Sequence, residues 1–284
     1  MEEITANLVK KLLPKRDPNG HKGTFGKVRI WGGAVGCTGA PVYAGEAACR
    51  TGSGLVFVAV PGEVYPIAAA RCDTAMVSPA PEEYEDLRSW MSRCDAALIG
   101  PGLGRAANTE KTVLALLRDL SCPVVLDADG INAAAAHIDI LSERSGVTVL
   151  TPHEGEFIRL GGALSQGRAP AAAAFARRYG CVLALKGPGT IVAGPDGVLL
   201  CNTTGNCGMA KGGSGDVLAG MTLSLLGQGA GPVDAAACAV WLHGRAGDLC
   251  AQELTAYAMT PADLLRYLPA AFKSLGLDNK MKED

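Results

Sequence analysis

Short runs of β-branched and aliphatic residues recur along the chain, and most of them end in glycine, aspartate or proline. The runs with the length of a buried strand are 28–31, 55–60, 96–99, 124–126, 147–150 and 182–185. Helical patterns lie between them, for example over 109–120 and 170–179. This alternation predicts an α/β fold in which a mostly parallel central sheet is flanked by helices on both faces.

The later part of the chain departs from this alternation. Runs 190–193 and 198–201 are joined by Gly194-Pro195-Asp196-Gly197, which predicts an antiparallel hairpin at one edge of the sheet. After Ser214 only helical patterns follow, so the carboxyl-terminal part is predicted to be helical. No linker or internal repeat interrupts the chain, which favours a single domain over 1–284 with a flexible tail over 275–284.

Composition excludes several classes of protein. Lys and Arg number 26 against 28 Asp and Glu, so nucleic acids and anionic membranes are not expected partners. No apolar run approaches the ~18 residues of a membrane span, and the amino end lacks a signal-peptide pattern. The ten cysteines are scattered without a C-x-x-C pair. We therefore expect reduced thiols in a cytoplasmic protein, with no zinc site.

A glycine-dense loop over 205–215 leads directly into an apolar helix. Such a loop presents free backbone N–H groups at the positive end of the helix dipole, which favours phosphate binding. It lacks the order of a P-loop. Asp216 follows this loop, where a carboxylate would repel phosphate unless it served another purpose, such as accepting a proton. The alternative is a first-turn acid that only favours the helix dipole.

Other polar residues follow predicted strands, where ligands gather in open α/β sheets. His153 and Glu156 follow run 147–150, and each either contacts a ligand or caps the next helix. Asp127, Asp129 and Asn132 follow run 124–126. The two acids are candidates to face a nucleotide-bound Mg2+, and the alternative is that Asp129 or Asn132 only caps the following helix.

Basic and glycine-rich segments also end predicted strands. Lys186 ends run 182–185 and either neutralises a phosphate or is solvated. Glycine clusters over 32–40 and 100–104 allow a ligand close to the backbone, although neither fits a dinucleotide fingerprint. The stretch 243–248 is interpreted as helix packing and left out of the site.

Taken together and in this order, these motifs resemble the ribokinase-like superfamily and, within it, the ADP-dependent NAD(P)H-hydrate dehydratases. The resemblance runs from about Lys22 to the carboxyl-terminal helices. Its most specific parts are Thr-Pro-His-x-Gly-Glu at 151–156 and Gly-Asn-x-Gly-Met-Ala-x-Gly-Gly-Ser-Gly-Asp at 205–216.

The resemblance implies an enzyme that uses ADP, with Mg2+, to remove water from the S form of hydrated NADH or NADPH, releasing AMP and phosphate. Asp216 would be the catalytic base. Carried over residue by residue, the implied contacts with the hydrated dinucleotide are Ala40, Gly104, His153 and Asp216. Those with the adenine nucleotide are Lys186, Gly187, Pro188, Gly189, Thr190 and Gly215, and the phosphate loop is Gly212, Gly213 and Ser214.

The resemblance also has departures and rivals. Many members carry an epimerase domain in front of this one, and we expect the dehydratase domain alone here; members also suggest a homotetramer. His153 stands where related kinases carry Asn, so Glu156 is at most a water-mediated metal contact. The nearest rival is a kinase of the same fold acting on a thiazole, pyrimidine or pyridoxal-like alcohol, and another is a nucleotide sensor without turnover.

Overall fold

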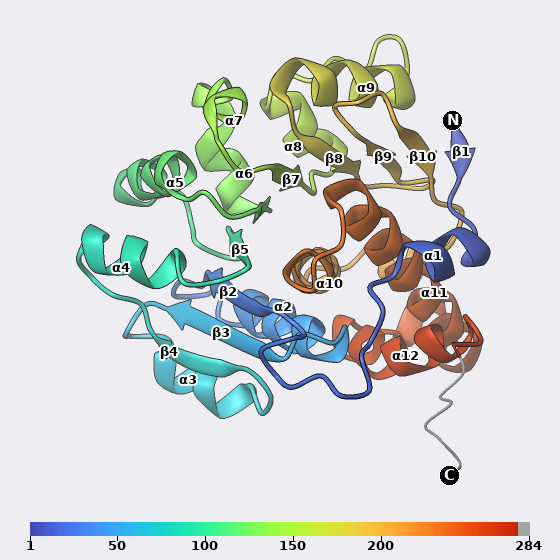
Figure 1. Ribbon diagram of the computed structural model, residues 1–284, viewed down its shortest axis with the longest axis horizontal. Helices are drawn as coiled ribbons and strands as arrows, with labels where there is room; N and C mark the ends of the chain where they lie inside the picture. Colours follow the sequence, from blue (N-terminus) through green and yellow to red (C-terminus); the bar gives the residue numbers. More distant parts are fainter. Residues whose placement is uncertain (278–284) are drawn as a thin grey trace.

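The computed structural model describes residues 1–277, in which ten strands form one sheet (Figure 1). The strands are β1 (Glu2–Glu3), β2 (Lys27–Trp31), β3 (Leu55–Val60), β4 (Met76–Pro79), β5 (Ala96–Ile99), β6 (Val124–Leu126), β7 (Thr148–Leu150), β8 (Val182–Leu185), β9 (Ile191–Ala193) and β10 (Leu199–Cys201). Their order is β1-β10-β9-β8-β7-β6-β5-β2-β3-β4. Only β9 runs against the rest, so the predicted parallel sheet is confirmed.

The predicted hairpin is present as β9 and β10, which pair antiparallel. Two strands were not predicted. β1 has only two residues and pairs with β10, so β1 is the edge strand and the hairpin lies next to it. β4 is the opposite edge strand and is only partly buried. Neither segment carries the hydrophobic period by which strands are recognised in a sequence.

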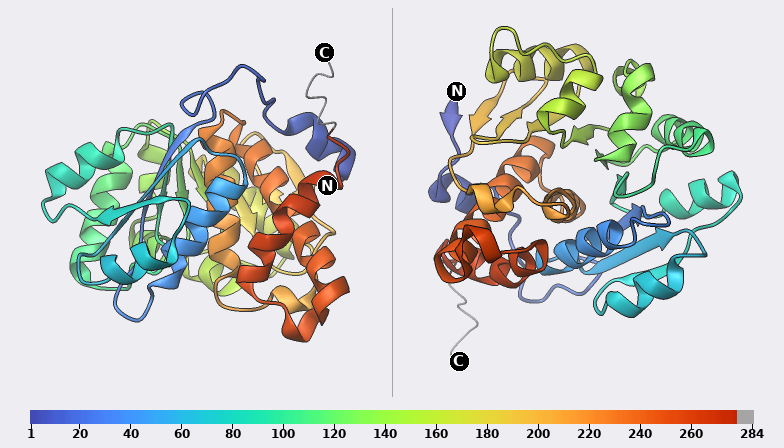
Figure 2. Two further views of the ribbon diagram at one scale, coloured as in Figure 1. Left: turned by 90° about the horizontal axis from the view of Figure 1, so that it is seen from below. Right: turned by 180° about the vertical axis from the view of Figure 1, so that it is seen from behind.

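Helices cover both faces of the sheet, as predicted. The helices are α1 (Ala6–Leu12), α2 (Gly39–Arg50), α3 (Tyr65–Arg71), α4 (Tyr84–Met91), α5 (Ala107–Asp119), α6 (Asp129–Ala134), α7 (Ile140–Glu143), α8 (Glu154–Arg159), α9 (Arg168–Tyr179), α10 (Ser214–Gly227), α11 (Pro232–Ala258) and α12 (Pro261–Lys273). One core lies under α2, α3 and α10–α12, and a second lies under α4–α9. Figure 2 shows α4 and α5 on one side of the sheet and α10–α12 on the other.

Helix α10 is almost completely buried between the sheet, α2 and α11. Its glycines permit this close packing. A Cβ atom on Gly220 would lie 2.1 Å from the backbone oxygen of Ala44 in α2, and one on Gly227 would lie 2.3 Å from Val28 in β2. The helix runs from the carboxyl ends of the parallel strands to their amino ends, so its first turn and its last turn meet opposite ends of the sheet.

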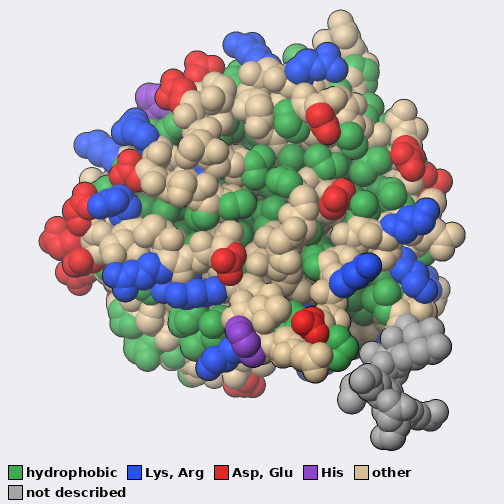
Figure 3. Space-filling model, in the orientation of Figure 1, with side chains coloured by type: hydrophobic (Ala, Val, Ile, Leu, Met, Phe, Trp, Pro, Cys, Tyr) green, Lys and Arg blue, Asp and Glu red, His purple; other side chains and the backbone are tan. Residues whose placement is uncertain are grey.

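The surface charges, the lack of a membrane span and the position of the chain end can each be compared with the sequence. On the face shown in Figure 3, acidic and basic side chains are interspersed. Within residues 1–277, no helix is long and apolar enough to cross a membrane. Of the tail expected over 275–284, Leu275 is buried in the core, and the carbonyl of Gly276 accepts a hydrogen bond from Lys10. Residues 278–284 lie outside the described part of the chain.

Candidate active site

A lysine surrounded by carboxylates lies at the carboxyl ends of β6, β7 and β8. Lys186 Nζ is 3.1 Å from Asp127 Oδ1 and 3.9 Å from Glu156 Oε2. Asp127 Oδ1 also accepts a 2.7 Å hydrogen bond from Thr151. Burial opposes the charge on Lys186, but the carboxylates of Asp127 and Glu156 outweigh it and raise the pKa of the lysine. Lys186 therefore stays protonated at neutral pH and supplies a fixed positive charge.

Asp216 joins this group from the first turn of α10. A Cβ atom on the preceding Gly215 would lie 3.2 Å from Lys186 Nζ, so the lysine reaches the start of the helix. Burial, followed by the charge of Asp127, raises the pKa of Asp216 to about 7. A carboxyl group with this pKa exchanges a proton near neutral pH, as a general base must. Burial also raises the pKa of Asp234, a first-turn acid of α11, but the charge of Asp127 adds to the shift only at Asp216. The position beside Lys186 and the glycine loop therefore distinguishes Asp216 from an acid that only favours the helix dipole.

His153 and Glu156 form a capping box at the start of α8. His153 Nδ1 accepts a 3.2 Å hydrogen bond from the backbone of Glu156, and Glu156 Oε2 accepts a 2.8 Å bond from the backbone of His153. Both residues thus do what the structural alternative expected. Since Nδ1 accepts, neutral His153 carries its proton on Nε2. Its side chain is 55% exposed, and Nε2 lies 3.6 Å from Glu156 Oε1, longer than a normal hydrogen bond, so a ligand can still approach Nε2–H.

Asp129, the first residue of α6, holds the glycine-rich turn 100–104. Its Oδ2 accepts a 2.9 Å hydrogen bond from the backbone of Gly104, and its Oδ1 accepts one from Asn132. A Cβ atom on Gly102 would lie 3.2 Å from that of Ala40, so the 100–104 turn also touches the start of α2. A cavity of about 200 Å³ opens beside Gly104 and Asp129. The structure therefore brings Ala40 and Gly104 together at one side of the site.

The backbone between Asp127 and Asp129 is strained. Ala128 has φ 50° and ψ −115°, a conformation that a residue with a Cβ atom rarely adopts. The next turn along the sheet depends on glycine, because a Cβ atom on Gly100 would lie 1.8 Å from the Asp127 carbonyl oxygen. This close approach fixes the direction in which the two aspartates leave β6.

Arg168 holds the turn from Lys186 to Thr190 and was not predicted. Its guanidinium donates hydrogen bonds of 2.5–3.2 Å to four carbonyl oxygens, those of Leu185, Lys186, Pro188 and Gly189. Nothing in the sequence distinguished this arginine from others at the start of a helix. It positions the turn from 18 residues away, measured to Lys186.

The glycine loop before α10 is held by residues from α11 and beyond. Asp248 accepts hydrogen bonds from the backbone of Gly205 at 2.9 Å and from the side chain of Asn206 at 3.2 Å. Lys211 donates to the carbonyl oxygens of Tyr257 and Met259. Gly213 has φ 100°, and Cβ there would lie within 3.2 Å of both Tyr43 and Pro261. The loop is therefore fixed before any ligand arrives.

The stretch 243–248, left out of the predicted site, packs against the glycine loop and the first turn of α10. Asp248 fixes the glycine loop, and His243 lies against the first turn of α10. Burial lowers the pKa of His243 to about 4, although a hydrogen bond with the Ser214 backbone acts in the opposite direction. His243 Nε2 and Ser214 Oγ are both buried without a hydrogen-bond partner. Polar residues inside an otherwise apolar helix were the signal that could have identified this stretch.

The described residues contain no ready-made metal site. No group of three or more His, Cys, Asp or Glu side chains within residues 1–277 is arranged to hold a metal ion. The oxygens of Glu156 face the cap of α8 and Lys186. A cation here would therefore need ligands from a bound phosphate and from water.

Comparisons with known proteins agree with this geometry. The profile of a family described as NAD(P)H-hydrate dehydratase matches residues 28–270. An ADP-dependent (S)-NAD(P)H-hydrate dehydratase of Bacillus subtilis is 34% identical over 281 residues, covering 95% of this chain and 97% of the relative. Bifunctional NAD(P)H-hydrate repair enzymes, such as that of Moorella thermoacetica (41% identity, 96% of this chain), are longer, and the chain spans about half of their length.

Two solved structures extend the agreement to the fold. The structure of a B. subtilis ADP/ATP-dependent NAD(P)H-hydrate dehydratase co-crystallised with ATP and Mg2+ has a TM-score of 0.83 and 32% identity, covering 96% of this chain and 98% of the other. The structure of a ribokinase-like superfamily protein of Enterococcus faecalis has a TM-score of 0.85 and 28% identity, covering 97% of this chain and 96% of the other. The fold is therefore ribokinase-like, as the sequence motifs indicated.

Proposed function

Because this chain belongs to the NAD(P)H-hydrate dehydratase family, we propose that it uses ADP to dehydrate the S form of hydrated NADH or NADPH. AMP and phosphate are the co-products. The observation that carries the proposal is Asp216, a carboxyl group with a pKa of about 7 at the start of α10, in one cluster with Lys186. A nucleotide sensor would not need a proton acceptor beside its phosphate loop.

Asp216 begins the reaction by accepting the proton from the hydroxyl group on the hydrated ring. The resulting oxygen attacks the terminal phosphoryl group of ADP, and AMP leaves. The ring then loses the phosphorylated oxygen as phosphate, together with a proton, and the dihydropyridine is restored. Backbone N–H groups of residues 212–215 lie at the amino-terminal, positive end of α10, and they stabilise the negative charge on the transferred phosphoryl group.

The adenine nucleotide is assigned to the later half of the chain. Its residues are Lys186, Gly187, Pro188, Gly189, Thr190 and Gly215. The support for this assignment is the contact between the lysine and the first turn of α10, and the anchoring of the turn by Arg168. Lys186, held protonated by its carboxylates, balances the negative charge that a nucleotide brings.

The hydrated dinucleotide is assigned to the other side of the loop. Its residues are Ala40, Gly104, His153 and Asp216. Ala40 and Gly104 border one pair of turns, and the exposed Nε2–H of His153 serves as a donor. The two ligands then meet at Gly213, which contacts Tyr43 of α2 on one side.

Mg2+ accompanies the nucleotide in this proposal. Glu156 Oε2, which lies 3.9 Å from Lys186 Nζ, contributes through water because this oxygen already accepts the hydrogen bond of the α8 cap. Mg2+ is commonly held by one or two carboxylates together with substrate phosphates. When bound, the ion neutralises charge on the phosphoryl oxygens.

The direct test mixes the protein with hydrated NADH, ADP and Mg2+, and follows the absorbance of reduced nicotinamide together with AMP and phosphate. We expect one AMP and one phosphate for each dihydropyridine restored. A stable phosphomonoester without recovered absorbance would instead indicate the kinase alternative. ADP bound without any product would indicate the sensor.

Assembly and location complete the proposal. We infer a single dehydratase domain, consistent with one continuous sheet, that assembles as a homotetramer in the cytoplasm. The ten cysteines are all free thiols, which suits a reducing compartment. Light scattering on the purified protein measures the subunit number.

A further inference from the structure

Two cysteines meet at the amino ends of β5 and β6, at the end of the sheet opposite the candidate active site. Cys94 Sγ and Cys122 Sγ are 4.0 Å apart. Each lies two residues before its strand, and the strands pair in parallel with Ala97 opposite Val124. Both side chains are half-buried. The backbone thus holds the two sulfur atoms close enough for rotation of the side chains to bring them into bonding contact.

The surroundings of the pair are positively charged. Arg144 donates hydrogen bonds to the carbonyl oxygens of Cys122 and Leu117, and Arg29 donates to that of Trp90, close to Cys94. Neither arginine forms an ion pair with a carboxylate in the part of the chain that the structure describes. Uncompensated guanidinium charge favours a thiolate.

Two contacts distinguish the two sulfurs. Cys94 donates its S–H to the carbonyl oxygen of Met91 at 3.0 Å, which holds it as a thiol. The contact with Cys94, followed by the charge of Arg144, lowers the pKa of Cys122. Cys122 is therefore the nucleophile of the pair, and Cys94 is placed to resolve it. A partly exposed cysteine of lowered pKa beside a second cysteine is the arrangement found in thiols that oxidise reversibly.

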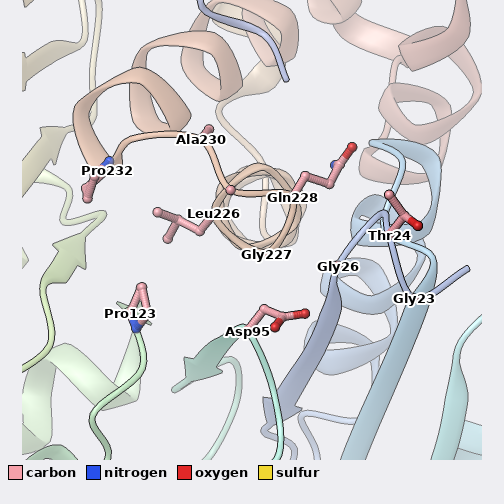
Figure 4. A pocket seen from close by; sticks show the side chains of 11 residues that line it. Gly23, Thr24, Gly26, Asp95, Pro123, Leu226, Gly227, Gln228, Ala230 and Pro232 are labelled. Atoms are coloured by element: carbon pink, nitrogen blue, oxygen red, sulfur yellow. The ribbon is translucent and has the colours of Figure 1, made fainter. Parts of the chain in front are cut away.

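A cavity of about 460 Å³ lies at the same end of the sheet. Asp95 and Pro123, the residues that directly follow the two cysteines, line it opposite Leu226 and Gly227 at the end of α10 (Figure 4). The cysteines themselves pack against the core on the other face of the sheet, under α4–α9. Both thiols are partly exposed there, unlike the buried Cys181 and Cys238, which leaves them open to a peroxide from solvent.

We propose that Cys94 and Cys122 form a peroxide-sensitive dithiol that closes to a disulfide in the folded protein. The Cys122 thiolate attacks one oxygen of hydrogen peroxide, breaking the O–O bond and giving a sulfenic acid and one water. Cys94 then attacks the oxidised sulfur, the S–S bond forms, and a second water leaves. Two thiols lose two electrons to one peroxide, and an added thiol reductant reverses the reaction.

The disulfide ties β5 to β6 across 28 positions of sequence. Such a cross-link restricts the unfolded chain, so the oxidised protein is expected to melt at a higher temperature, by roughly 5 °C for a loop of this length in a chain of this size. This inference is independent of the proposed function, because neither cysteine belongs to the site and neither measurement uses turnover.

Trypsin separates the two cysteines into peptides 94–105 and 119–144, each of which contains one cysteine. The reduced, folded protein is treated with one equivalent of hydrogen peroxide, its remaining thiols are alkylated, and the unreduced digest is analysed by mass spectrometry. We expect peptide 94–105 linked to 119–144 as the main disulfide product. Dithiothreitol should release both peptides and restore the original melting temperature.

Three variants control the experiment. Cys94→Ser and Cys122→Ser should each abolish the linked peptide and the rise in melting temperature, while Cys49→Ser, another half-buried cysteine, should retain both. Circular dichroism confirms that each variant is folded. A linked peptide that forms only after denaturation, or a different main disulfide in the wild type, would overturn the proposal.

Discussion

The two ends of the parallel strands differ in how they treat charge. At the carboxyl ends, Lys186 lies among Asp127, Glu156 and Asp216, whose charges raise the pKa of the lysine. At the amino ends, the cavity beside Asp95 is lined mainly by glycine, proline and aliphatic residues. Helix α10 presents its positive end to the first region and its negative end to the second. Only the carboxyl ends of the strands therefore meet the positive end of α10, and matched substitutions at the two ends test this difference.

The largest effect is expected from removing the carboxylate at the start of α10. Asp216→Asn keeps the shape of the side chain but removes the proton acceptor, so turnover should fall by about 10²–10⁴. ADP affinity, measured by calorimetry, should be retained. Asp234→Asn is the matched control, since Asp234 is a first-turn acid of α11 near the opposite cavity, and its turnover should stay within about twofold. Equal losses in both variants would reduce Asp216 to a dipole partner.

The next largest effect is expected from alanine substitution at one of two glycines that both have a positive φ. Gly213 in the loop has φ 100°, and Gly229 at the opposite end has φ 89°. Alanine at either position costs about 1–2 kcal/mol in this left-handed region. Only at Gly213 would the new methyl group also meet neighbours, Tyr43 and Pro261.

Gly213→Ala should therefore lower turnover more than tenfold, whereas Gly229→Ala should lower only the melting temperature. Calorimetry should show ADP and the dinucleotide each binding Gly213→Ala within about tenfold of the wild type, a difference of about 1.4 kcal/mol. If neither ligand binds a folded Gly213→Ala protein, the two subsites do not adjoin at the loop.

The dependence of kcat/KM on pH tests the role of Asp216 at the carboxyl ends of the strands. The pKa of Asp216 is raised to about 7, so the carboxyl group is protonated and inactive as a base below that pH. We expect kcat/KM to fall about tenfold per pH unit on the acid side of pH 7. A flat profile down to pH 5 would contradict the role of Asp216.

The same shift carries a cost in stability. An acid whose pKa is higher in the folded state destabilises that state as pH rises through the interval from its unfolded value to about 7. Asp216→Asn removes this cost, so the variant should melt above the wild type, and by more at pH 8 than at pH 5. Asp234→Asn should show a smaller difference, because Asp234 lacks the additional charge of Asp127.

The smallest effect is expected at His153. Its imidazole both caps α8 and offers Nε2–H to a ligand. His153→Ser retains a good cap but loses the donor, whereas His153→Ala loses both and should be about 1 kcal/mol less stable. Both should raise the KM for the hydrated dinucleotide more than that for ADP. A rise only in the alanine variant would assign His153 to helix capping alone.

The sequence predicted the central strands and the turns that follow them, because short apolar runs and glycine clusters are local signals. It did not predict Arg168, Asp248 or His243 as parts of the site. Asp248 meets Gly205 across 43 positions, and only the packing of α11 beside the loop brings them together. The capping of α8 by His153 was anticipated as an alternative, since a cap is also a local pattern.

The close packing of α10 against α2 has a consequence for how this protein tolerates change. Gly220 lies one turn beyond Asp216, and no side chain fits between it and Ala44 without separating the two helices. A methyl group there would displace the whole first turn rather than a single side chain, since a helix moves as a rigid rod. Substitutions that alter the reaction are therefore expected in the loops. The middle of α10 does not tolerate larger side chains, although none of its residues belongs to the proposed ligand contacts.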